Sequence, residues 1–151
     1  MKSLDRQVEL LASYFSQSNA KNLEVSSVPI IWHLDHSLRV INSITRALEQ
    51  SDPLKFKRNF NFWRIVFFTT KYIPRGKAKA PQQVKPEQQI NFSELKKRLN
   101  YALENIEKLT QLPNNAHFPH PYFGQLNLKQ SKKFIRIHTK HHLKIIEDIL
   151  K

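Results

Sequence analysis

Apolar side chains recur every three or four positions along four stretches of the chain, which is the spacing that places them on one side of an α-helix. These stretches cover residues 3–17, 28–50, 91–112 and 127–151. The pattern predicts four long helices, and bundles of four such helices bury their apolar sides against one another. We therefore expect an all-α protein built as a four-helix bundle.

Polar residues at the helix starts agree with these boundaries. Asn91 is followed three positions later by Glu94, and Asn127 by Gln130, and both pairs match the capping box that opens many helices. Pro29 suits the first turn of the second helix, where its missing N–H is not needed.

The chain between the second and third helices departs from this pattern and predicts an irregular insertion. Residues 56–73 are dense in aromatic side chains and favour a further helix, although a strand over residues 65–70 fits almost as well. Residues 74–91 combine proline with lysine and glutamine and predict a loop, as do residues 113–126. With 151 residues in total, we expect a single domain over 1–151.

The charge is strongly unbalanced, with 25 lysines and arginines against 12 acidic residues and a net charge of +13. Such a charge attracts nucleic acids and other polyanions. The densest basic cluster lies at 71–79, but no recognised nucleic-acid motif accompanies it. A solvated basic loop is the simpler interpretation of that cluster.

The absence of cysteine from the sequence excludes disulfides, thiolate metal sites and a cysteine nucleophile. A metal site must therefore use histidine, aspartate or glutamate. The first residues lack the apolar core of a signal peptide, and the most apolar stretch, 60–73, is interrupted by Asn61, Arg64 and Lys71. We expect a cytoplasmic protein without a membrane partner.

Two histidines of the last predicted helix share its apolar side. His138 and His142 are four residues apart, so at about 100° per residue they stand one turn above each other within the stripe of apolar side chains. His141 falls at the edge of that stripe, and we expect it to flank the pair.

The second predicted helix offers a third histidine. His33 lies at the centre of its apolar stripe, His36 falls at the edge, and Asp35 points to nearly the opposite side. Each histidine by itself is more simply a hydrogen-bonded core residue. Three central imidazoles need polar partners, however, and a shared transition metal would satisfy all of them.

These angles predict a metal site made of His33, His138 and His142, with His36 as the alternative to His33. Three histidine ligands leave coordination positions open for water or a substrate.

The remaining pair, His117 and His120, belongs to the predicted loop 113–126. We expect their rings to pack over one end of the bundle, where prolines direct the chain. In the alternative, His120 or Tyr122 lines the mouth of the site as a proton donor.

Three segments carry a family resemblance: 32–36 (WHLDH), 120–124 (HPYFG) and 138–142 (HTKHH). Together with Ser26, seven residues before His33, they resemble the DinB-like superfamily of four-helix metalloproteins, and most closely an uncharacterised bacterial subgroup of it. The likeness extends over essentially the whole chain.

The resemblance implies an up-down-down-up bundle and a divalent ion, zinc or nickel, held by His33, His138 and His142. Some DinB-like proteins are transferases or isomerases that use a low-molecular-weight thiol as cosubstrate, and homodimers are common among them. This chain departs from such proteins in its positive charge and in the basic loop 71–91.

The sequence therefore favours a metal-dependent transferase or hydrolase that acts on a small molecule. The alternative is a basic, non-enzymatic protein that binds nucleic acid or another polyanion. A third hypothesis is a small-molecule binder whose aromatic pocket comes from residues 60–72.

Overall fold

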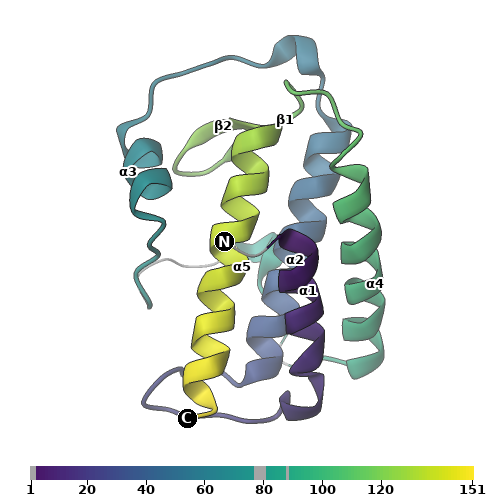
Figure 1. Cartoon of the computed structure of the whole chain (residues 1–151), viewed down its shortest axis with the longest axis vertical. Coiled ribbons are helices and arrows are strands. Elements are labelled where there is room, and N and C mark those ends of the chain that lie inside the picture. Colours follow the sequence, from purple (N-terminus) through teal and green to yellow (C-terminus); the bar gives the residue numbers. More distant parts are fainter. Residues whose placement is uncertain (1–2, 77–80, 88) are drawn as a thin grey trace.

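The protein is mostly helical, and its described residues form five α-helices and one small antiparallel sheet (Figure 1). The computed structural model describes residues 3–76, 81–87 and 89–151. The helices are α1 (Leu4–Ser13), α2 (Ile30–Gln50), α3 (Phe62–Thr70), α4 (Phe92–Lys108) and α5 (Leu128–Ile149), and the strands are β1 (His117–His120) and β2 (Gly124–Asn127). This confirms the predominantly helical prediction.

The long helices α1, α2, α4 and α5 lie side by side. In Figure 1, α1 and α5 run downward, whereas α2 and α4 run upward. Helix α2 contacts both α4 and α5, and α1 contacts the same two helices from its own side. The apolar core between them includes the fully buried Leu11, Leu34, Ile41, Leu95 and Ile146. Removal of this apolar surface from water is the main force that holds the helices together.

One of the two predicted capping boxes forms in full. The Asn127 side chain accepts from the Gln130 N–H, and the Gln130 side chain accepts from the Asn127 N–H. Asn91 also caps its helix, by accepting from Ser93 N–H at 2.8 Å. The carboxylate of Glu94 instead pairs with Lys97 Nζ at 2.8 Å, so the reciprocal half of that box was predicted wrongly.

The prediction of a loop over 113–126 was wrong at the hairpin. Strands β1 and β2 pair antiparallel, with Phe118 opposite Leu126 and His120 opposite Gly124. Each strand has only four residues and β1 contains Pro119, so the alternation of apolar and polar positions was too short to reveal them.

The insertion between α2 and α4 contains the predicted extra helix, but in a shorter form. Helix α3 starts after Asn61, whose side chain caps Arg64 N–H, and ends at Lys71, which adopts a left-handed conformation with φ of 53°. Further along, the 3-10 turn Gln82–Val84 contacts α2. Lys77 and Lys79 of the basic cluster lie outside the described residues.

Helix α2 is buried on several sides at its middle. Six consecutive residues, 33–38, are buried there, because α4, α5, β1 and the 3-10 turn all contact this helix. As the helical angles predict, Asp35 lies on the side of α2 opposite to His33. This side of the helix is also buried. The Asp35 carboxylate is fully buried and accepts from Arg98 of α4 at 2.8 Å and from Arg39 at 2.7 Å.

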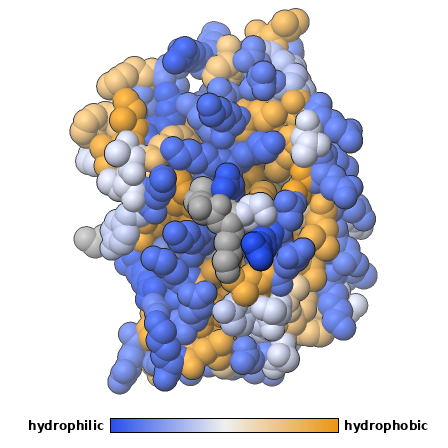
Figure 2. Space-filling view, in the orientation of Figure 1, coloured by the Kyte–Doolittle hydropathy of each residue, from blue (hydrophilic) through white to orange (hydrophobic). Residues whose placement is uncertain are grey.

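Helix α3 and the residues that flank it expose large apolar side chains. Five of them are at least half exposed: Phe60, Phe62, Trp63, Ile65 and Tyr72. Hydrophobic colouring accordingly gathers at the upper left of Figure 2, where α3 lies in Figure 1. Within the described ranges, no helix combines the length and the apolar character needed to cross a bilayer.

Replacement of Asp35 by asparagine should lower the free energy of unfolding by roughly 2–3 kcal/mol, because it leaves two arginines beside a buried site without their counter-charge. Urea denaturation measures this. Glu87→Gln is the matched control, since Glu87 contacts the same Arg39 but is 74% exposed. The control should cost less than about 0.5 kcal/mol, and equal losses in the two variants would contradict the assignment.

Candidate metal centre

Four histidine side chains meet between α2 and α5. His33 and His36 come from consecutive turns of α2, and His138 and His142 from consecutive turns of α5. The ring centroids of His138 and His142 are 4.6 Å apart, and His36 lies 5.0 Å and 4.9 Å from them. One ring nitrogen from each of these three lies within 4.8 Å of the others, a spacing that suits a single metal ion.

The tautomer of His36 is fixed by the insertion. Its Nδ1 lies 2.8 Å from the backbone carbonyl oxygen of Val84, in the 3-10 turn. A carbonyl can only accept, so Nδ1 must donate and Nε2 must carry the lone pair. Trp32 stacks on the same ring at 4.9 Å and restrains its orientation. Such a backbone contact is typical of a histidine that is held ready to ligate a metal.

The lone pair of His36 faces His138. The two Nε2 atoms are 3.2 Å apart, which is close to the ~3.3 Å between two nitrogens on a tetrahedral zinc ion. His138 is partly exposed, but its Nδ1 is buried and has no hydrogen-bond partner among the described residues. In this pair, His36 presents an oriented lone pair, and His138 has a ring nitrogen without a hydrogen-bond partner among the described residues.

His33 joins the cluster through His142. Their Nδ1 atoms are 3.0 Å apart, so without a metal one of the two must carry a hydrogen. The other nitrogen of His33, Nε2, lies 2.9 Å from the Ser26 hydroxyl, whose oxygen also accepts from Val28 N–H at 3.2 Å. The serine seven residues before His33 is thus its hydrogen-bond partner.

The structure brings the predicted residues His138 and His142 together and sets His33 against His142. The third member of the compact triplet, however, is His36, which the helical angles placed at the edge of the core. His36 is 4% exposed because the 3-10 turn covers that edge. The helical-angle prediction assumes that each helix has a single buried side. It therefore could not show that the 3-10 turn buries a second side of α2.

The two outlying groups of histidines pack around the cluster. The ring of His141 lies 5.1 Å from that of His142 and stays outside the triplet. In the hairpin, His120 stacks on Phe123 at 4.3 Å and meets the edge of Phe134 at 4.7 Å. Phe134 in turn stacks on His138, so the hairpin supports the site through an aromatic contact.

Burial keeps these imidazoles neutral. It lowers the pKa of His33 to about 4, with smaller effects in the same direction from the positive charges of His36, His141 and Arg75. Burial is also the main cause of the lowered pKa values of His36, His138 and His142. At neutral pH these imidazoles are therefore uncharged, and each keeps one nitrogen lone pair of the kind that metal binding needs.

The fold and this site define a helical protein with a buried histidine cluster able to hold a metal ion. A family model described as "Protein of unknown function (DUF1569)" matches residues 3–148, and the chain belongs to that family. Neither the curated proteins nor the solved structures contain a match to the chain.

Metal-free protein should lose stability as the pH falls below about 6.5. The unfolded chain then binds protons at histidines that the folded protein keeps neutral, at up to ~1.4 kcal/mol per pH unit for each group. Above that pH the contribution is complete. Chemical denaturation in the presence of a chelator between pH 7 and pH 5 measures the slope before most carboxylates titrate.

His33→Gln removes one titrating group and should make this pH dependence shallower. A free energy of unfolding that stays constant or rises as the pH falls would contradict the buried neutral state of the cluster.

Proposed function

We propose that this protein binds one divalent transition metal ion, zinc or nickel, between α2 and α5. The proposal includes an up-down-down-up four-helix bundle of the DinB-like kind, made of α1, α2, α4 and α5. The helix directions in Figure 1 support that topology, because α2 and α4 run the same way and need the long insertion to connect them.

The observation that carries the proposal is the triplet of His36, His138 and His142. One ring nitrogen from each lies within 4.8 Å of the others, and burial lowers the pKa of all three imidazoles, which favours their uncharged form. Three imidazoles suit zinc and nickel better than magnesium or calcium, which prefer oxygen ligands. A bound ion would also replace the nitrogen-to-nitrogen contact between His36 and His138 with two ligand bonds.

Two ligand sets agree with these contacts. In the first, His36, His138 and His142 bind the ion, and His33 supports His142 from behind through their 3.0 Å contact. In the second, which the sequence favours, His33 replaces His36. We propose the first set because the Val84 carbonyl already orients the lone pair of His36.

Three protein ligands leave open positions on the ion. We therefore propose that the ion binds a small molecule there, such as a low-molecular-weight thiol, and lowers the pKa of the bound group. This chemistry is that of a transferase or a hydrolase. Nucleic-acid binding through the net charge of +13 stays a prediction.

Protein purified without a tag should carry close to one equivalent of zinc or nickel, measured by elemental analysis. His138→Ala and His142→Ala should lose at least about tenfold in metal affinity, because each removes a ligand bond. Of His36→Ala and His33→Ala, the former should have the larger effect.

His141→Ala is the matched control, since it removes a neighbouring imidazole on the same helix outside the triplet, and it should keep the metal. Failure to bind zinc or nickel even after reconstitution would overturn the proposal. A larger loss from His33→Ala than from His36→Ala would select the second ligand set.

Cobalt-substituted protein tests the open coordination positions. A low-molecular-weight thiol such as cysteine should bind the cobalt ion as a thiolate and produce a new charge-transfer band in the near ultraviolet. The same spectra recorded with serine provide the control. Bands that do not change with the thiol would show that the site is closed and the metal structural.

A further inference from the structure

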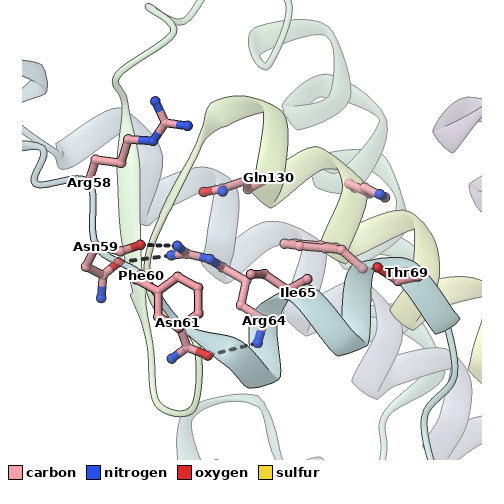
Figure 3. A pocket seen from close by; sticks show the side chains of 10 residues that line it. Arg58, Asn59, Phe60, Asn61, Arg64, Ile65, Thr69 and Gln130 are labelled. Atoms are coloured by element: carbon pink, nitrogen blue, oxygen red, sulfur yellow. Dashed lines mark hydrogen bonds between the residues drawn. The ribbon is translucent and has the colours of Figure 1, made fainter.

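A pocket of about 520 Å³ lies where α3 and the chain before it meet the start of α5 (Figure 3). Its lining includes three cations, three amides and two aromatic rings: Arg58, Arg64, Lys133, Asn59, Asn61, Gln130, Phe60 and Phe68. The volume is within the range of small-molecule sites. This pocket is separate from the histidine cluster, because Gln130 precedes His138 by eight residues, or ~12 Å along the axis of α5.

The described residues that line the pocket are positively charged overall and include no carboxylate. Arg64 is only 8% exposed, and its guanidinium donates to oxygens of Asn59 and to the carbonyls of Phe123 and Gln125. Within the described part of the chain, no acidic side chain pairs with Arg64. A buried cation without a counter-charge is costly, so an anion bound from solution would be favoured here.

Other groups in the pocket present donors. The Gln130 side-chain oxygen already accepts from Asn127 N–H at 3.1 Å, so the NH₂ group is the part of this amide that can donate to a ligand. Lys133 Nζ lies over the Phe68 ring, 5.2 Å from its centroid. Arg58 is exposed, and in Figure 3 its guanidinium lies above Gln130, while the Arg64 guanidinium points to Asn59.

The wall of the pocket is held in place by the hairpin. Asn61 Nδ2 donates to the Tyr122 carbonyl at 3.0 Å, and a Cβ on Gly124 would come within 2.6 Å of Asn59 Nδ2. Gly124, with φ of +68°, thus permits both the turn and the close approach of Asn59. A site whose donors are positioned before binding loses less entropy when the ligand arrives.

We propose that this pocket binds an organic phosphate that carries a planar ring, of the mononucleotide class. The phosphate offers two negative charges and three acceptor oxygens to the arginines, Lys133 and the Gln130 amide. The ring stacks on Phe60, which is 80% exposed and therefore open to a partner. The inference stands apart from the proposed metal site.

Isothermal titration with adenosine 5′-monophosphate tests the proposal, with inorganic phosphate and adenosine as separate ligands. The nucleotide should bind more tightly than either of them. Arg58→Ala and Lys133→Ala should each weaken its binding by about tenfold or more, since each removes a charged hydrogen bond. Arg58 is exposed, so its replacement leaves the fold intact.

Two variants serve as controls that should leave nucleotide affinity unchanged. Arg46→Ala removes an exposed arginine of α2, and His138→Ala removes a proposed metal ligand. Equal losses in Arg46→Ala and Arg58→Ala would overturn the proposal in favour of diffuse attraction by the net charge. Loss of nucleotide binding in His138→Ala would place the phosphate at the histidine cluster. If inorganic phosphate bound as tightly as the nucleotide, the proposed stacking of the ring on Phe60 would be overturned.

Discussion

The burial of α2 on several sides is the constraint from which the rest of the structure follows. At its middle, residues 33–38 are covered by α4, α5, the hairpin and the 3-10 turn, so a polar side chain there cannot stay in water and needs a partner inside the protein. Asp35 finds two arginines, Ser37 donates to the His33 carbonyl, and His33 and His36 find the histidines of α5. The buried helix thereby gathers four imidazoles at one place.

The insertion between α2 and α4 contributes to both proposed sites. Because α2 and α4 run in the same direction, the chain must return along the whole length of the bundle before α4 starts (Figure 1). Its first part forms the wall of the basic pocket with Arg58 and Arg64. Its last part brings the Val84 carbonyl to His36. The insertion that the topology requires thus supplies side chains to the basic pocket and a backbone carbonyl to the histidine cluster.

Helical periodicity was enough to predict the long helices and the side of α5 that carries His138 and His142, because both depend on local spacing. It was not enough for His36 or for the hairpin. The position of His36 depends on a turn almost fifty residues away, and the hairpin depends on two four-residue strands that pack on the end of α5. Contacts of this kind are decided by tertiary packing, which leaves little trace in a single sequence.

The bond from His36 to Val84 also links two equilibria. The carbonyl favours the His36 tautomer whose Nε2 is free, so docking of the 3-10 turn on α2 and ligand binding at Nε2 stabilise each other. Thermodynamic reciprocity requires the coupling to act equally in both directions. Anything that binds at the imidazoles therefore tightens residues 82–84 against α2, and anything that pulls this turn away weakens the imidazole site by the same factor.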